Sequence, residues 1–98
     1  MIVRLSAEAE LDLEAIGDFI ARDDPSRALS FLHELREKCL GLAEMPQRFP
    51  LVPRYEVTGV RRRVHGDYLI FYRIYEQSVV ILHVLHGARN YGTILFPA

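Results

Sequence analysis

The sequence predicts an α+β domain with the element order β-α-α-β-β-β, in which a helical hairpin packs on one face of a mostly antiparallel four-stranded sheet. Two segments in the first 45 residues repeat apolar side chains every three or four positions, as amphipathic helices do. The segment 60–86 is instead rich in β-branched and aromatic side chains, which favour strands. With 98 residues, the chain has the length of one domain, residues 1–98.

The segment 60–86 is predicted to form a three-stranded meander. Gly66-Asp67 and Glu76-Gln77-Ser78 interrupt it with residues that are typical of turns. The predicted strands are Val60–His65, Tyr68–Tyr75 and Val79–Leu85. The preceding segment, 46–59, contains three prolines and is expected to be a surface loop with a brief strand near Tyr55–Thr58.

The start of the chain supplies one strand and the first helix. Ile2–Leu5 is a short strand candidate, and Ser6 is a suitable N-cap for a helix over residues 7–22. Four acidic side chains lie away from the apolar stripe of this helix and are expected to form a solvated face: Glu8, Asp12, Glu14 and Asp18.

The second helix is predicted to begin at Pro25, with Asp24 as its cap, and to end before Pro46. Because its connection to the first helix is very short, the two helices should be antiparallel neighbours. Three further apolar side chains widen its stripe: Leu29, Leu40 and Ala43. Burial of this helix on more than one side is therefore expected.

Alternation along the strands assigns one face of the sheet to the core under the helices. The inward set is Val60, Val64, Ile70, Tyr72, Ile74, Val80, Leu82 and Val84. The outward set is Arg61, Arg63, His65, Leu69, Phe71, Arg73, Tyr75, Val79, Ile81, His83 and Leu85. A two-residue turn at Glu76-Gln77 would place the sets chosen for the last two strands on opposite faces. This assignment therefore requires a bulge or an odd-length turn there.

The outward face carries more large apolar side chains than a face that meets only water. One interpretation is that the proline-rich loop or the C-terminal tail covers this face. The favoured interpretation is that a partner protein docks on it. The residues expected to meet that partner are Leu69, Phe71, Arg73, Ile81, His83 and Leu85.

Charge is divided unevenly along the chain, although the net charge is only −1. Residues 1–45 carry five basic and ten acidic side chains, whereas residues 46–98 carry seven and three. This division predicts an acidic helical side and a basic sheet side, but not the larger basic excess of a protein that binds free DNA. The single cysteine, Cys39, is expected to be a buried structural thiol. The absence of a long apolar run or a signal core favours a cytoplasmic protein without membrane contact.

The sequence contains no motif for a phosphate-binding loop, a metal site or a catalytic triad, so neither a metal nor a cofactor is expected. Candidate chemistry lies in the segment HGARNY, residues 86–91, and in the arginines of the sheet. His86 could transfer a proton, Arg63, Arg73 and Arg89 could hold phosphates, and Tyr91 could stack on a base. This set suits RNA cleavage by attack of the 2′-hydroxyl. The alternative is that His86 and Tyr91 pack the sheet edge while the arginines are solvated or paired.

Nearly the whole chain resembles the ParE/RelE superfamily of bacterial toxins, and ParE more closely. The resemblance rests on LSAEA at 5–9, on Asp12, Ile16 and Pro46, and above all on RRRVHGDYLIFYRI at 61–74 with VVILHVLHGAR at 79–89. It implies the β-α-α-β-β-β fold. It also implies the toxin half of a type II toxin–antitoxin pair, neutralised by a ParD-like antitoxin whose C-terminal segment wraps the toxin.

The resemblance to ParE implies inhibition of DNA gyrase without catalysis. RelE-like relatives instead cleave mRNA on the ribosome, and they usually carry an arginine at the position of Leu69. The target-facing residues are expected to be Arg61, Arg63, His86, Arg89 and Tyr91. One alternative is a RelE-like ribosome-dependent mRNA endonuclease that uses Arg63, Arg73, His86, Arg89 and Tyr91. Another is a degenerate toxin that only binds its antitoxin.

Overall fold

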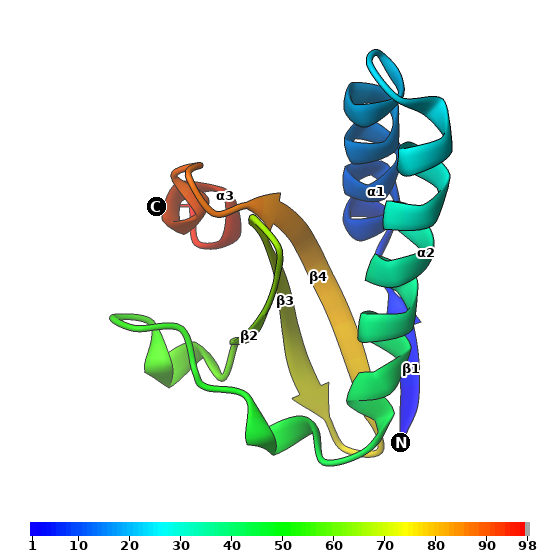
Figure 1. Ribbon diagram of the computed structural model, residues 1–98. Helices are drawn as coiled ribbons and strands as arrows, with labels where there is room; N and C mark the ends of the chain where they lie inside the picture. The colour runs from blue at the N-terminus through cyan, green and yellow to red at the C-terminus, as the bar shows by residue number, and fades with distance from the viewer. Residues whose placement is uncertain (98) are drawn as a thin grey trace.

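The computed structural model describes residues 1–97 and places a helical hairpin beside a four-stranded sheet (Figure 1). The elements are β1 (Ile2–Leu5), α1 (Ala7–Ala21), α2 (Pro25–Leu40), β2 (Arg61–His65), β3 (Tyr68–Tyr75), β4 (Ser78–His86) and α3 (Tyr91–Leu95). The strand order is β1-β4-β3-β2, in which only β1 and β4 are parallel. The predicted α+β fold and its mostly antiparallel sheet are therefore confirmed.

Both long helices begin where the sequence predicts. The Ser6 side chain accepts a hydrogen bond from Ala9 N, and the Asp24 side chain accepts one from Arg27 N, each at 3.0 Å. These caps satisfy amide groups that would otherwise lack partners in the first turn.

The second helix is shorter and less buried than expected. It ends at Leu40 and continues as a 3₁₀ turn over Gly41–Ala43. Leu29 and Leu40 are 74% and 58% exposed, so the expectation that they widen a buried stripe is wrong. The physical reason is that α2 packs on one side, mainly against α1, and that its outer side has no partner within residues 1–97.

The proline-rich loop contains two 3₁₀ turns, Pro46–Arg48 and Glu56–Thr58, and the brief strand expected near Tyr55–Thr58 is absent. Gly59 ends the second turn with φ of 78°, a left-handed conformation that glycine adopts without strain. The loop then returns to the sheet, where Leu51 forms an isolated bridge to Arg61. This path carries Val52 and Val60 onto the face of the sheet opposite the hairpin.

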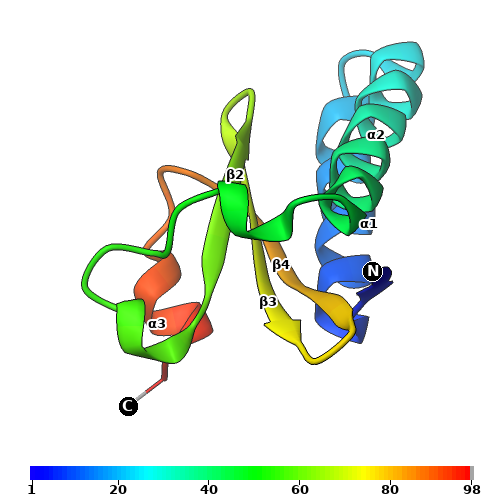
Figure 2. The ribbon, with the colours of Figure 1, turned by 90° about the horizontal axis from the view of Figure 1, so that it is seen from below.

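Apolar side chains fill both faces of the sheet, because α3 and the loop cover the face opposite the hairpin (Figure 2). The helix-side core contains Leu13, Leu35, Cys39, Ile70, Tyr72, Val79, Ile81 and Val84, among others. The opposite core consists of Val52, Val60, Leu69, Phe71 and Leu85, with Tyr91, Ile94 and Leu95 of α3 packed against it. Coverage by the loop and the C-terminal segment, the less favoured interpretation of the sequence, is therefore correct.

The inward set predicted for β3 is correct, whereas the set predicted for β4 is partly wrong. A two-residue turn pairs Tyr75 with Ser78, so Val79 and Ile81, rather than Val80 and Leu82, face the helices. The bulge that the face assignment required does exist, but it lies within the strands and not at the turn Glu76-Gln77. The register shifts between Phe71 and Tyr72 of β3, opposite Leu82 of β4. This bulge returns Val84 to the helix side and leaves Leu85 in the opposite core.

The face assignment of β2 is reversed. Arg63 donates to Lys38 O at the end of α2 at 3.1 Å, and His65 Nε2 lies 3.0 Å from Glu34 Oε1, so both side chains are on the helix side. Val64 is exposed, and Val60 is buried in the opposite core. Because β2 is an edge strand beyond the reach of the apolar stripe, long polar side chains can lie there and bond to α2.

The hydrogen bonding of β1 to β4 is continued by side chains after β1 ends at Leu5. The Ser6 hydroxyl donates to Leu82 O at 2.9 Å, and Val84 N donates to Asp12 Oδ2 at 2.9 Å. His83 Nδ1 lies 2.8 Å from the same oxygen of Asp12. Asp12 is thus an anchor between α1 and β4, and the expectation that it belongs to a solvated face is wrong.

Replacing Asp12 with alanine should lower the free energy of unfolding by about 1.5–3 kcal/mol, because Val84 N and His83 would lose a charged acceptor in a partly buried position. Asp18→Ala, at an exposed position of the same helix, is the matched control and should change the free energy by less than about 0.5 kcal/mol. Urea unfolding of both variants measures the difference. Equal stability of the two variants would contradict the anchoring role.

Candidate functional site

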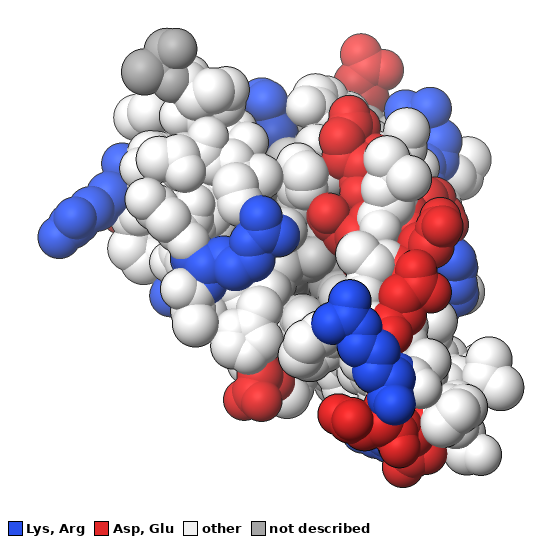
Figure 3. Space-filling view, turned by 90° about the horizontal axis from the view of Figure 1, so that it is seen from above, with Lys and Arg blue, Asp and Glu red and all other residues white. Residues whose placement is uncertain are grey.

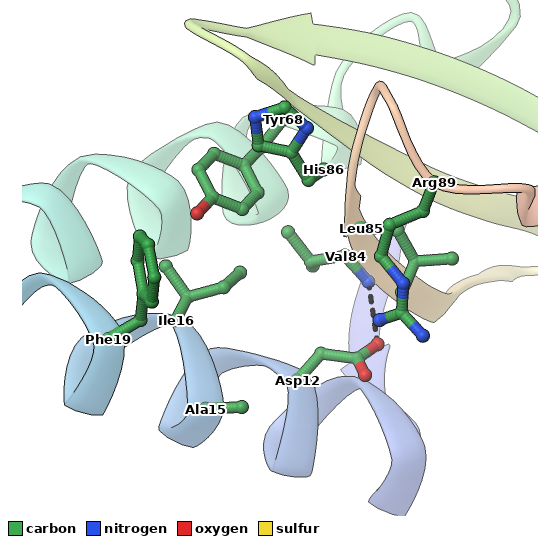
Figure 4. Close-up of a pocket in the computed structure, with 9 residues that line it drawn as sticks. All are labelled: Asp12, Ala15, Ile16, Phe19, Tyr68, Val84, Leu85, His86 and Arg89. Atoms are coloured by element: carbon green, nitrogen blue, oxygen red, sulfur yellow. Dashed lines mark hydrogen bonds between the residues drawn. The ribbon is translucent and has the colours of Figure 1, made fainter.

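A cleft of about 340 Å³ lies between α1 and the adjoining ends of β3 and β4 (Figure 4). Its apolar walls come from Ala15, Ile16 and Phe19 of α1, Tyr68 of β3, and Val84 and Leu85 of β4. Its polar groups are Asp12, His86 and Arg89. An apolar cleft with a few polar groups at its margin is a typical binding site.

His86 is exposed at the end of β4, and its ring has one free nitrogen. Ala88 N donates to His86 Nδ1 at 3.0 Å, so the neutral ring carries its proton on Nε2. The ring meets Tyr68 edge-on, with centroids 5.2 Å apart. Burial, together with the nearby Asp67 carboxylate, raises the pKa of Tyr68, so this phenol stays protonated at neutral pH.

Arg89 follows the last strand and is exposed. Figure 4 shows its side chain at the same end of the cleft as Asp12. Among residues 1–97, Arg89 forms no ion pair within the chain. Its guanidinium group can therefore meet an anionic or carbonyl group of a partner at no cost in internal contacts.

Two of the expected target-facing arginines instead hold parts of the fold together. Arg61 donates to the carbonyl oxygens of Gln47 at 3.1 Å and Phe49 at 2.7 Å. Arg63 donates to Lys38 O and lies over the ring of Phe49, 4.7 Å from its centroid. Both guanidinium groups thus fix the proline-rich loop and the end of α2 against β2.

Tyr91 is also occupied by internal contacts. Its hydroxyl accepts a hydrogen bond from Arg62 at 2.9 Å, and its ring lies 5.0 Å from that of Phe71. The side chain therefore fastens α3 to the sheet, as in the alternative in which Tyr91 packs the sheet.

The five residues of the ribonuclease alternative do not meet at one place. Arg63 lies on β2 and His86 on β4, and the intervening β3 separates these strands by about 10 Å. Arg73 is five positions along β3 from Tyr68, the partner of His86, a separation of about 17 Å. Of the expected target-facing and catalytic residues, the cleft brings together only His86 and Arg89.

The residues expected to form an exposed docking face are mostly buried. Phe71 and Ile81 are 0% exposed, and Leu69 and Leu85 are nearly as inaccessible. The expectation of an exposed apolar face is wrong, because α3 and the loop cover one side and the helices cover Ile81 on the other. The remaining members lie elsewhere: His83 contacts Asp12, and Arg73 stacks over the ring of Tyr75 at 4.9 Å.

Phe19 is a member of the cleft that the sequence analysis missed. It is 63% exposed on α1, where it forms part of the cleft wall. The available signal was an aromatic residue in a helix outside the stripe of Leu13, Ile16 and Ile20.

The described residues offer little metal or thiol chemistry. Within residues 1–97, no group of three His, Cys, Asp or Glu side chains could hold a metal ion. Cys39 is fully buried, and burial raises the pKa of its thiol to about 11, so it is confirmed as a buried structural thiol. None of the helices within residues 1–97 is long and apolar enough to cross a membrane.

Solved structures of toxin–antitoxin systems share this architecture. A chain of the chromosomal ParDE toxin–antitoxin system from P. aeruginosa superposes with a TM-score of 0.75 and 24% identity, covering 88% of this chain and 95% of that chain. A chain of the toxin–antitoxin complex RelBE2 from Mycobacterium tuberculosis gives a TM-score of 0.66 and 31% identity, with coverage of 90% and 92%. A search of curated protein sequences gave no match.

The family comparison covers most of the sequence. The model described as the ParE toxin of the type II toxin–antitoxin system parDE matches residues 3–91, which include both long helices and all four strands except the first residue of β1. The chain therefore belongs to the ParE toxin family of type II toxin–antitoxin systems.

Proposed function

We propose that this chain is a toxin that inhibits DNA gyrase and thereby replication, and that a ParD-like antitoxin neutralises it in the cytoplasm. The match of the ParE family model to residues 3–91 carries this proposal. Inhibition by protein–protein contact fits the cleft, which pairs apolar walls with the exposed His86 and Arg89.

A ribosome-dependent mRNA endonuclease is the second candidate, because His86 and Arg89 line the same cleft. Cleavage of RNA needs proton transfer and a cation at the same phosphate. Arg63, Arg73 and Tyr91 lie too far away or are occupied by internal contacts. The position at which RelE-like relatives usually carry arginine is Leu69, which is buried here. These features favour the non-enzymatic proposal. A degenerate toxin that only binds its antitoxin would leave growth unaffected.

Neutralisation is proposed to occur by occlusion at the cleft. A segment of the antitoxin with apolar side chains would fill the space between Phe19 and Leu85. His86 and Arg89 line the same cleft, so the segment would cover the residues proposed to face the target. Of the residues first expected to bind the antitoxin, Leu85 lines the cleft although it is only 2% exposed. His83 contacts Asp12, which also lines the cleft.

Induction of this chain alone in bacteria should stop DNA synthesis early while protein synthesis continues. Incorporation of labelled nucleosides and amino acids, followed separately, measures both rates. The purified chain should then block supercoiling by gyrase. If translation stopped first, the ribonuclease would replace gyrase inhibition as the preferred function. If neither rate fell, the chain would be a degenerate toxin.

Arg89→Glu should reduce growth arrest at equal expression, because the reversed charge would repel the target surface that the arginine meets. Arg4→Glu is the matched control, since Arg4 is exposed on β1 away from the cleft. Growth after induction, with circular dichroism to establish folding, compares the two variants. Equal arrest by both would remove Arg89 from the target-facing surface.

Phe19→Asp should weaken binding of the antitoxin by at least about ten-fold, since a large apolar anchor would be lost from the cleft. Leu40→Asp is a close control because Leu40 is similarly exposed but lies at the end of α2, outside the cleft. Calorimetric titration of both variants gives the affinities. Loss of affinity by less than about two-fold in Phe19→Asp would move the antitoxin site elsewhere.

A further inference from the structure

The loop between α2 and β2 contains a finger, defined as residues 53–58, that extends away from the rest of the fold. Figures 1 and 2 show this loop at the side of the molecule opposite the hairpin. Val57 lies in the 3₁₀ turn of the finger and is 101% exposed, more than any other large apolar side chain within residues 1–97. Because single exposed apolar side chains are common on protein surfaces, this exposure alone does not identify a contact surface.

The finger is held in one conformation by contacts within the chain. Tyr55 N donates to Val52 O at 3.0 Å. The Thr58 hydroxyl donates to Tyr55 O at 2.6 Å and accepts a hydrogen bond from Val60 N at 3.2 Å. The Tyr55 ring stacks on that of Phe96, with centroids 4.2 Å apart and planes inclined by 17°. A loop that is fixed in this way loses little conformational freedom when it binds a partner.

Arg54 holds the finger in a backbone conformation that a long side chain does not favour. Its φ is 74°, in the left-handed region that glycine adopts without strain. The side chain is exposed, and its guanidinium group forms no ion pair within residues 1–97. No ion pair of the described chain therefore offsets the strain. Backbone strain of this kind is concentrated at binding and switch sites, which indicates that a partner supplies the missing contact.

The charge around the finger is mainly basic and is not neutralised within the described chain. Arg73 lies at the base of the finger, since a Cβ added to Gly59 would be 3.8 Å from Arg73 Nε. Neither Arg54 nor Arg73 forms an ion pair within residues 1–97, and Glu56 is the one acidic side chain of the finger. Figure 3 shows acidic side chains gathered over the hairpin, with few over the rest of that face. An acidic partner surface would therefore be attracted to the finger.

We infer that the finger is a second target-facing element, whose Val57 enters an apolar pocket of the target protein while Arg54 and Arg73 meet acidic groups at the rim of that pocket. The inference rests on the proposed toxic action of the chain, but not on gyrase being the target. A nucleic acid would also attract the arginines, but the valine gains free energy only when it is buried against an apolar surface. The finger shares no residue with the cleft, so an antitoxin segment in the cleft would leave the finger exposed.

The apolar part of the inference is tested by growth arrest in bacteria. The amount of inducer that halves the growth rate should rise at least about ten-fold for Val57→Asp, because the pocket would have to accept a charge. Val64→Asp is the matched control, since Val64 is 64% exposed on β2, outside the finger and the cleft, and its effect should be less than about two-fold. Circular dichroism and calorimetric titration with the antitoxin establish that both variants fold. Equal arrest by Val57→Asp and the unaltered chain, or equal loss in the two variants, would overturn the inference and leave the proposed function intact. Absence of arrest by the unaltered chain would overturn both.

The strain and charge at Arg54 provide a second measurement. Arg54→Gly should unfold at the same or a higher temperature than the unaltered chain, because glycine adopts a φ of 74° without strain. The same variant should nevertheless weaken growth arrest by at least about five-fold, whereas Arg54→Lys, which keeps the charge, should retain most of it. Equal arrest by Arg54→Gly and the unaltered chain would overturn the role of the arginine. Purified gyrase without DNA is the direct probe of a protein pocket, and a loss of affinity that appeared only when DNA was added would overturn that choice of partner.

Discussion

The arrangement of this protein depends on the carboxylate of Asp12, which continues the hydrogen bonding along β4 after β1 has ended. β1 pairs with only part of β4, and beyond Ile81 the edge of β4 would expose unpaired backbone groups beneath α1. Ser6, which lies between β1 and α1, and Asp12, which lies in α1, form hydrogen bonds to these backbone groups instead. An unsatisfied amide in this partly buried position would cost about 1–3 kcal/mol. The bond fixes the distance between α1 and β4, and with it the width of the cleft that Phe19 and His86 line.

The bulge opposite Phe71 is the second constraint, because it determines which side chains of β4 enter each of the two cores. Before the bulge, Ile81 faces the helices, and after it Leu85 faces α3. A strand that is apolar on both sides needs cover on both sides, so a short C-terminal helix is required although it buries no residue of its own completely. Arg62 and Tyr91 fasten that helix to the outermost strand. The arginine-rich segment of β2 therefore acts mainly within the fold. His86 and Arg89 remain as the exposed residues that we propose to face a target.

The sequence predicted the elements well because helix caps, turns and β-branched composition are local signals, as at Ser6, Asp24 and Gly66. It failed on the faces of β4, since this strand is apolar at nearly every position and alternation cannot locate a bulge. It also failed on Leu29, because helical periodicity does not distinguish a leucine in the core from one that is exposed. For the candidate site, the sequence analysis selected His86 and Arg89 for their chemistry, and both line the cleft. Phe19 and the anchoring role of Asp12 depend on how α1 meets β4, which no local pattern specifies.

The exposed side chains of α1 give a partner that binds at the cleft a thermodynamic advantage. α1 packs against α2 and β4, whereas its Leu11 and Phe19 remain exposed. A partner that covered these side chains would stabilise α1 in the position set by Asp12, because any ligand of the native state stabilises that state. The antitoxin would then do more than cover His86 and Arg89. It would complete the apolar surroundings of α1, and its release would return an active chain whose hairpin is less stable than in the complex.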